Sequence, residues 1–493
     1  MTPLPGTPES CWIADAPPTR YPRLTASGDS DVVVIGGGIV GLTAAFLLAR
    51  AGAAVTLVDA GRIGHGVTGR STAKVTCQHA LAFSVIASQL GVDKAALYAD
   101  ANRAGVETLV GLVQDLDIDC DLERTAAYAY TLHHDRRDAL EREAALARSF
   151  GIDAVVVDAP PVPFATAGAV MFANQAQFNP AKYLVGLAAA FRRSGGRIHE
   201  NTRIDDLSHT RQGWRATAGR HRLRAAHAVS ATHIPIGSPI DYDEVTEPRC
   251  HVAMAFRAPP GALDGMHIDV DQPSHSLRMG RDAQGPLLIA LGPRFATGHD
   301  GDVARRFADL AAWVKANVPA AGDVAYRWVN EDYDSPDGIP YAGQLDRKAP
   351  QLYVATGFNG WGISNGTAAA CLIADQVLGA KSGWAELYDP ERRSRRINDG
   401  GDTQSLVSGV EGIRPGEGGV VDYGKTKIAI WKSPRGRVHA FDAACTHKGC
   451  TLTWNGAMRQ WDCPCHGSMF TCKGEVIHGP ATSPLKPAKL PKA

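Results

Sequence analysis

The stretch DVVVIGGGIVGLTAAFLLARAGAAVTLVDA, residues 31–60, decides the fold of the first part of the chain. It starts with a β-branched run, passes through glycines in the spacing G-x-G-x-x-G, continues as an alanine- and leucine-rich segment and ends in a second apolar run. This order predicts a strand, a tight turn, a helix and a second strand, the first unit of a doubly wound α/β sheet. We therefore expect an α/β protein with a Rossmann-like nucleotide-binding domain.

The glycines and the last acid of this stretch have separate physical roles. Gly36 permits the tight turn, Gly38 lets the backbone approach a pyrophosphate, and Gly41 lets the helix pack close to the strand. The phosphates would lie at the helix N-terminus, where free N–H groups and the helix dipole favour negative charge. Asp59 follows the second strand and can accept hydrogen bonds from a ribose diol. A glycine turn in an ordinary α/β sheet is the alternative, which the register of strand, helix and acid disfavours.

Length and charge restrict the class of protein. The 493 residues are enough for two or three domains, and basic and acidic residues balance at 51 each, so we expect no nucleic-acid partner. The N-terminus lacks the basic and apolar regions of a secretory signal. The longest apolar stretch, 32–49, has the glycine pattern of a buried strand–turn–helix. We predict a cytoplasmic protein without a transmembrane segment, for which peripheral membrane association stays open.

Changes in composition and in the hydrophobic pattern along the sequence predict the domain boundaries. Residues 1–27 precede the first strand as an N-terminal extension, and residues 28–390 form the nucleotide-binding part. Alternating apolar segments near 250–257 and 286–291 predict an antiparallel substrate subdomain over roughly 240–325. Residues 391–404 are charged and polar and predict a linker, which would let the tail swing if it is flexible. Residues 405–493 consist of short strand patterns, with a hairpin turning at 434–436.

A second glycine-rich segment, YVATGFNGWGISNG at 353–366, predicts a site for a flat ring. Gly357, Gly360 and Gly362, together with Asn359, would let the backbone lie against the ring. The helix expected from about residue 365 would point its N-terminus at the ring, where it stabilises negative charge. A loop before an ordinary core helix is the alternative.

Four segments resemble the glycine/D-amino-acid oxidase family of FAD enzymes. They are GRIGHGVTGRSTAKVT (61–76), NQAQFNPAKYLVGLAAAFRRSGGRIHENTRI (174–204), DSPDGIPYAG (334–343) and the glycine-rich segment at 353–366. The resemblance runs over about 28–390 and implies FAD as cofactor and a small amine or amino acid as substrate. Some members hold the flavin through a cysteine near the closing segment. Since VNEDYDSPDG (329–338) has no cysteine, we expect non-covalent FAD.

Catalytic residues are harder to identify from the sequence. Lys74 and His79 follow the loop expected at the flavin and could touch substrate or flavin, or be structural. Arg249 and His251 lie on a predicted strand of the substrate subdomain, where an arginine could bind a carboxylate in bidentate fashion. For each of the four, a purely structural role is the alternative.

The tail contains two cysteine–histidine boxes, CTHKGC at 445–450 and CPCHGS at 463–468. Cys445, His447, Cys463 and His466 follow the spacing C-x-H-x15-C-x2-H, which indicates a metal site. Structural zinc is one alternative, although zinc ligands usually come as C-x2-4-C and H-x3-5-H pairs.

The boxes and the segment HGPATSPL (478–485) resemble Rieske domains of the respiratory type over about 405–490. The resemblance implies that these four residues hold a [2Fe–2S] cluster and that Cys450 and Cys465 form a disulfide. Imidazole ligands raise the reduction potential to about −150 to +300 mV. High-potential members have a tyrosine two residues after the serine that stands here as Ser468. This chain has Phe470, which cannot donate a hydrogen bond, so we predict a potential below the top of that range.

Together the motifs predict a Rossmann-like FAD-binding domain, an antiparallel substrate domain and an all-β Rieske domain. This layout resembles a bacterial family of oxidoreductases with a Rieske tail. It implies a dehydrogenase that passes electrons singly through the cluster to an acceptor protein or quinone. An O2-using oxidase with a structural cluster and a redox-sensing protein are the alternatives. Ring-hydroxylating oxygenases fit less well, since they lack the inner cysteine pair.

Overall fold

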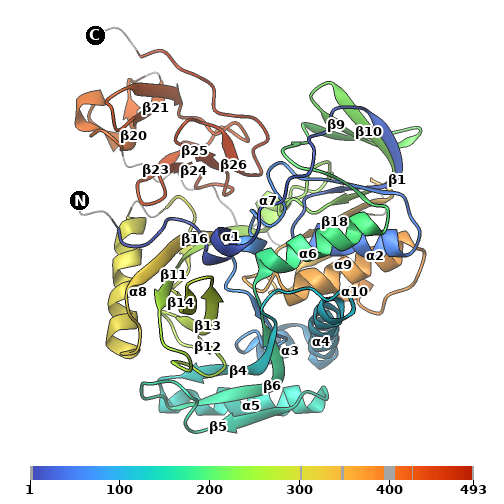
Figure 1. The fold of residues 1–493 in the computed structure, drawn as a ribbon, viewed down its shortest axis with the longest axis vertical. Coiled ribbons are helices and arrows are strands. Elements are labelled where there is room, and N and C mark those ends of the chain that lie inside the picture. Colours follow the sequence, from blue (N-terminus) through green and yellow to red (C-terminus); the bar gives the residue numbers. More distant parts are fainter. Residues whose placement is uncertain (1–3, 300–301, 346–348, 393–405, 425, 491–493) are drawn as a thin grey trace.

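The computed structural model describes residues 4–299, 302–345, 349–392, 406–424 and 426–490. The predicted strand–turn–helix–strand unit is present as β1 (Gly28–Ile35), α2 (Ile39–Arg50) and β2 (Val55–Val58), with β1 and β2 parallel (Figure 1). The second half of β1 and all of β2 are buried, as expected for strands of a parallel sheet that is covered on both faces. The Rossmann-like prediction is confirmed.

The first sheet has the strand order β17-β18-β10-β1-β2-β7 within the described residues. In addition, β9 pairs with β10, and β8 pairs with β9. Its further strands are β7 (Arg197–His199), β8 (Asp206–Thr210), β9 (Gly213–Ala218), β10 (His221–Ser230), β17 (Tyr341–Leu345) and β18 (Leu352–Thr356). Helices α6 (Pro180–Arg193) and α9 (Ser364–Val377) pack on α2. The Asn179 side chain caps α6 by accepting from the N–H groups of Ala181 and Lys182, and a proline occupies the first turn.

The second sheet is mostly antiparallel and has the order β15-β11-β14-β13-β12-β4-β6-β3, with β16 on β11 and β5 on β6. Its strands are β3 (Lys74–Val75), β4 (Glu123–Thr131), β5 (Ala154–Val157), β6 (Gly168–Gln177), β11 (Glu247–Arg257), β12 (Met266–Asp269), β13 (Ser276–Asp282), β14 (Gly285–Leu291), β15 (Phe295–Ala296) and β16 (Val324–Asp334). The sheet therefore extends beyond the expected 240–325, because strands from the first half of the chain join it. Alternation reveals a strand but not the sheet to which it pairs.

The remaining helices of the FAD-binding part range from single turns to one helix of 24 residues. They are α1 (Cys11–Asp15), α3 (Ala82–Leu90), α4 (Val92–Asp115), α5 (Arg137–Ser149), α7 (Tyr242–Val245), α8 (Val303–Asn317) and α10 (Ala385–Tyr388). Helices α3 and α4 are separated by Gly91, whose φ of +94° ends α3. Among the described residues, no helix is both long enough and apolar enough to span a bilayer.

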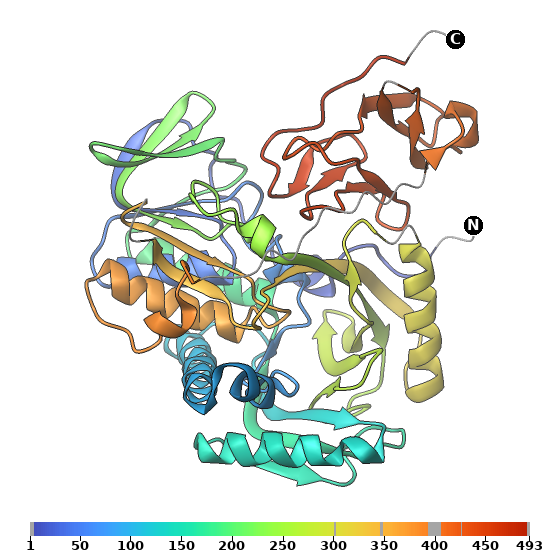
Figure 2. The ribbon, with the colours of Figure 1, turned by 180° about the vertical axis from the view of Figure 1, so that it is seen from behind.

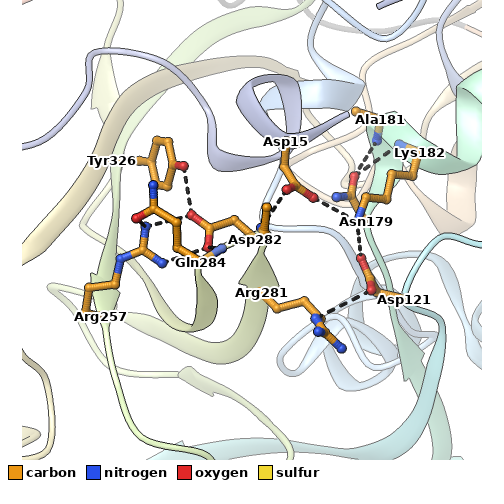
Figure 3. Close-up of polar contacts among 11 residues, drawn as sticks. Asp15, Asp121, Asn179, Ala181, Lys182, Arg257, Arg281, Asp282, Gln284 and Tyr326 are labelled. Atoms are coloured by element: carbon orange, nitrogen blue, oxygen red, sulfur yellow. Dashed lines mark hydrogen bonds and ion pairs between the residues drawn. The ribbon is translucent and has the colours of Figure 1, made fainter. Parts of the chain in front are cut away.

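The N-terminal extension folds into the molecule through α1. The Asp15 carboxylate lies 2.8 Å from Lys182 Nζ on α6 and accepts from the Ala283 N–H beside β13, also at 2.8 Å (Figure 3). Trp12 is buried and donates its indole N–H to Ser71 O at 2.9 Å. The extension thus connects α6 to the end of β13 in the second sheet.

In the described residues, the C-terminal domain consists of two small sheets, which are antiparallel except for the parallel pair β19–β20. One contains β19 (Leu406–Val407), β20 (Gly418–Asp422), β21 (Lys427–Lys432) and β22 (Val438–Asp442), and the other β23 (Thr453–Asn455), β24 (Gln460–Asp462), β25 (Met469–Thr471) and β26 (Val476–His478). β21 and β22 form the predicted hairpin, which turns at Gly436 with φ +80°.

The C-terminal domain is docked against the FAD-binding part, near α7 and the ends of β11 and β16 (Figures 1 and 2). Tyr333 Oη donates to His466 O at 2.9 Å, and His233 Nδ1 lies 3.0 Å from His478 Nε2. Lys448 Nζ lies 2.8 Å from Asp243 Oδ2. These contacts argue against a swinging tail. Beyond Arg392, the predicted linker lies outside the described residues.

Candidate active site and metal centre

A cavity of about 690 Å³ opens where the carboxyl ends of β1 and β10 meet the second sheet. Its walls include the glycine turn at 36–38, Asp59, the loop at 358–364 and the cavity-facing side chains of β11 and β16. Residues 477–482 of the C-terminal domain line the same cavity. Ligands of open α/β sheets bind at the carboxyl ends of the strands, so the position fits a nucleotide cofactor.

The glycine turn has the geometry that its spacing predicts. Gly36 has φ +104°, and a Cβ there would lie 2.4 Å from Ala231 O. A Cβ on Gly41 would lie 2.0 Å from Gly36 O, so any larger residue would separate helix and turn. Gly36 and Gly38 line the cavity, whereas Gly41 acts through packing.

Asp59 lies in the cavity wall with its carboxylate already oriented. Its two oxygens accept from the N–H groups of Gly37 and Gly61, each at 2.7 Å. Burial raises the pKa of Asp59, and these two backbone bonds counteract that shift. Each oxygen keeps a lone pair that can accept from a ribose hydroxyl.

Most of the closing loop lies at the cavity. Asn359 and Gly360 have φ of +57° and +83° and line the cavity, as does Gly362. The Asn359 amide donates to Ser335 Oγ at 2.9 Å and Gly357 O at 2.8 Å. Gly357, with φ +73°, does not line the cavity and serves the turn instead. Helix α9 starts at Ser364, which lines the cavity, so the helix N-terminus lies at this wall.

Lys74 lies in the cavity wall and is buried. Its Nζ donates to His267 O at 2.6 Å and to Ser276 Oγ at 2.5 Å. Burial, and secondarily the charge of Arg278, lowers the pKa of Lys74 to about 7. An amine with that pKa can exchange a proton near neutral pH.

His79 is not among the described residues that line the cavity. Its Nδ1 lies 2.6 Å from Tyr98 Oη, its Nε2 lies 3.0 Å from Ser364 Oγ, and its ring stacks at 4.5 Å on Trp361, which does line the cavity. Burial lowers the pKa of His79 to about 3, so the ring is neutral. The structure gives His79 a supporting position behind Trp361 rather than contact with a ligand.

Arg249 and His251 both face the cavity from β11. Arg249 forms a 2.8 Å ion pair with Glu247. His251 is buried, its Nδ1 has no hydrogen-bond partner, and burial lowers its pKa to about 3. His251 can therefore accept a hydrogen bond from a ligand in the cavity.

The four cysteine–histidine residues form two pairs. The thiols of Cys445 and Cys463 interact, which lowers the pKa of Cys445 and raises that of Cys463, and the rings of His447 and His466 lie 5.1 Å apart between centroids. Both histidine Nδ1 atoms are buried without a partner. Two adjacent sulfurs and two free ring nitrogens fit a cluster in which two thiolates hold one iron and two imidazoles hold the other. Cys450 and Cys465 form a disulfide beside them.

Comparison with known proteins supports both the flavin site and the cluster site. Residues 31–376 match the family described as FAD dependent oxidoreductase. The chain belongs to this family. Residues 404–489 match the Rieske [2Fe-2S] domain, so this FAD dependent oxidoreductase has a C-terminal Rieske domain, and its cofactors are FAD and a [2Fe–2S] cluster.

The relatives of this protein cover different shares of its chain. The protein YhfW of Bacillus subtilis, named as a Rieske 2Fe-2S iron-sulfur protein, is 30% identical over 98% of each chain. Gamma-glutamylputrescine oxidoreductase of Escherichia coli is 24% identical over 73% of this chain and 86% of its own. The crystal structure of glycine oxidase from Geobacillus kaustophilus has a TM-score of 0.60 at 19% identity, covering 74% of this chain and 99% of its own, and so shares the fold.

Several residues at the junction of the two domains were not predicted. His233 follows β10 with φ +70° and lines the cavity, and its Nε2 lies 2.9 Å from Asp332 Oδ1. Asp332 also accepts from the N–H of Gly360 in the closing loop. The stretch NEDYD at 330–334 has polar or acidic residues at both odd and even positions, and this signal in the sequence could have indicated a strand with two polar faces.

Proposed function

We propose that the protein is a dehydrogenase that oxidises a small amine or amino acid and passes the electrons singly through the Rieske cluster to an external acceptor protein or quinone. FAD supplies two-electron oxidation of a C–N bond, and the cluster supplies one-electron transfer. Each turnover removes two electrons from the substrate, gives an imine that water can hydrolyse, and reduces two equivalents of a one-electron acceptor.

The proposal assigns the residues of both centres. Gly36, Gly38 and Asp59 would hold the phosphates and ribose of FAD, and the loop containing Asn359, Gly360 and Gly362 would face the ring. Cys445, His447, Cys463 and His466 would hold the cluster, with the histidines bound through their unpartnered Nδ1 atoms.

A wall of one sheet layer lies between the cavity and the cluster site. This short separation is the observation that supports electron transfer most directly. Strands β11 and β16 are antiparallel neighbours, with Arg249 opposite Asp332 and Pro248 opposite Tyr333. Arg249 and Asp332 face the cavity. The far side of the wall faces the C-terminal domain, because a Cβ on Gly467 would lie 2.7 Å from Tyr333 Oη and 2.9 Å from Pro248 Cβ. Opposite faces of the same two strands therefore contact the two sites.

Tyr333 connects the two sides of this wall. Its hydroxyl donates to the backbone oxygen of His466 at 2.9 Å, and its ring packs edge-on against His233, which lines the cavity, at 4.7 Å between centroids. Tunnelling through bonded and closely packed atoms is faster than through gaps. The chain His233–Tyr333–His466 thus offers a compact path between the cavity and a cluster ligand.

The cavity lining suits a small amine substrate. Lys74, with its lowered pKa, can be neutral and accept a proton from a substrate ammonium group, which must lose its charge before the C–N bond is oxidised. Arg249 can pair with a substrate carboxylate. Relatives named glycine oxidase and gamma-glutamylputrescine oxidoreductase support this substrate class.

The test is anaerobic reduction of the purified protein with a panel of amines and amino acids, read at both chromophores. Loss of the flavin absorbance followed by the EPR signal of a reduced cluster is the expected result. Fast peroxide formation in air without cluster reduction would favour an oxidase. If no small substrate reduces the flavin, while dithionite reduces both centres, the dehydrogenase proposal fails and a sensing role is favoured.

A further inference from the structure

Helix α7 places an acid against both histidines of the cluster site. Asp243 Oδ2 lies 3.6 Å from His447 Nε2 and 3.6 Å from His466 Nε2. The Asp243 side chain is 6% exposed, so bulk water screens it weakly. This acid belongs to the FAD-binding part, whereas both histidines belong to the Rieske domain.

The two ring nitrogens of each histidine have different surroundings. The Nδ1 atoms are buried and have no partner, while the Nε2 atoms face Asp243. With iron on Nδ1, the outer edges of both imidazoles would lie against this single carboxylate. The distances of 3.6 Å are too long for strong hydrogen bonds, so the interaction is mainly electrostatic.

We propose that Asp243 is a positioning residue that lowers the reduction potential of the Rieske cluster across the domain interface. Reduction adds one electron, converting one ferric iron to ferrous, and the extra negative charge is repelled by a nearby carboxylate. A carboxylate facing a metal-bound imidazole also makes the ligand more electron-donating, which shifts the potential in the same direction. The inference rests on the proposed ligand set, but not on the identity of any substrate.

Lys448 offsets part of the effect of the Asp243 charge on the reduction potential. Its Nζ lies 2.8 Å from Asp243 Oδ2 and 3.1 Å from Glu244 Oε1. Glu244 is the adjacent acid on α7 and forms an ion pair with Lys448, whereas Asp243 forms an ion pair with Lys448 and also lies 3.6 Å from both histidines. The two acids therefore offer a matched comparison: each substitution removes one negative charge that pairs with Lys448, and the Asp243 substitution also removes the carboxylate that lies 3.6 Å from both imidazoles.

The test is an EPR-monitored redox titration of the full-length protein with both cofactors, using dithionite and mediators. Asp243→Asn should raise the midpoint potential so that the ratio of reduced to oxidised cluster at a fixed potential rises about tenfold, equivalent to about 59 mV for one electron. Glu244→Gln should give less than half of that shift. Iron, sulfide and FAD contents equal to those of the wild type show that each variant is intact.

Equal shifts in the two variants, or no rise in Asp243→Asn, would overturn the proposal. If Asp243→Asn fails to retain its cluster, Lys448→Met provides the second measurement. Removing this cation leaves the Asp243 charge less compensated, so the potential should fall, and an unchanged or higher potential would contradict the role of Asp243. Because no substrate is used, a failed substrate screen leaves this result interpretable.

Discussion

The cluster site and the flavin cavity are built in opposite ways. The proposed cluster ligands lie between Cys445 and His466, in two loops of one small domain. The cavity is lined by segments spread from Ile35 to Thr482, and much of its shape depends on glycines, where a side chain is absent. The cluster site therefore depends on a few individual side chains, whereas the flavin cavity depends on how distant segments pack.

The largest expected effect is on the cluster site. Cys463→Ser should abolish the cluster, because a hydroxyl cannot replace a thiolate as a comparable ligand for iron. Iron and acid-labile sulfide should fall to background while FAD content stays unchanged. Cys472→Ser, in the same domain at a half-buried cysteine outside the two boxes, should keep its cluster. Retained sulfide in Cys463→Ser would refute the ligand set.

The second prediction concerns the flavin cavity, which overpacking at a glycine should disrupt. Gly41→Ala would place a Cβ 2.0 Å from Gly36 O, and overpacking of this kind costs about 1–3 kcal/mol. We expect lower FAD occupancy and a lower free energy of unfolding, measured by flavin absorbance and urea denaturation. Gly111→Ala is the control: it also lies inside a helix but has no atom within 4 Å of the added Cβ, so it should stabilise α4 by roughly 0.5–1 kcal/mol.

A third substitution tests the boundary between the two sites. Gly467→Ala would place a Cβ 2.5 Å from Glu331 Oε1 and 2.7 Å from Tyr333 Oη, pushing the domains apart. The expected result is a several-fold slower reduction of the cluster after photoreduction of the flavin, followed by rapid-freeze EPR.

Gly436→Ala is matched to Gly467→Ala in backbone strain. The two glycines have φ of +80° and +78°, so each alanine costs roughly 1–2 kcal/mol in conformation, but Gly436 has open space around it. A similar slowing in both variants would mean that strain within the Rieske domain, rather than loss of docking, is responsible.

The smallest expected effect is the pH dependence of substrate oxidation. Because burial lowers the pKa of Lys74 to about 7, the amine is charged below that pH and cannot accept a proton. The rate of flavin reduction by a substrate found in the screen should therefore rise by about twofold from pH 7 to pH 8, as the neutral fraction of the amine rises from about one half to about nine tenths. Lys74→Met should remove this step from the profile. A step that persists unchanged in the variant would assign it to another group.

Sequence patterns predicted much of the fold where the signal is local. The unit at 28–58 and the hairpin at Gly436 both follow from periodicity or turn chemistry over a few residues. The extent of the second sheet was not predicted, because it depends on the pairing of β4 with β12, two segments that lie far apart in the sequence. His79 shows the same limit: its sequence position is beside the flavin loop, but its side chain packs behind Trp361.

The sequence by itself determined the two cofactor classes, because both rest on the spacing of residues within short segments. Only the tertiary structure placed Tyr333 between the two sites and Asp243 against both histidines. No local pattern relates a residue of α7 to one in the Rieske domain more than 200 positions later, since that contact exists only when two separately folded surfaces dock. The chemistry of each centre is therefore encoded locally, while their communication is decided by packing.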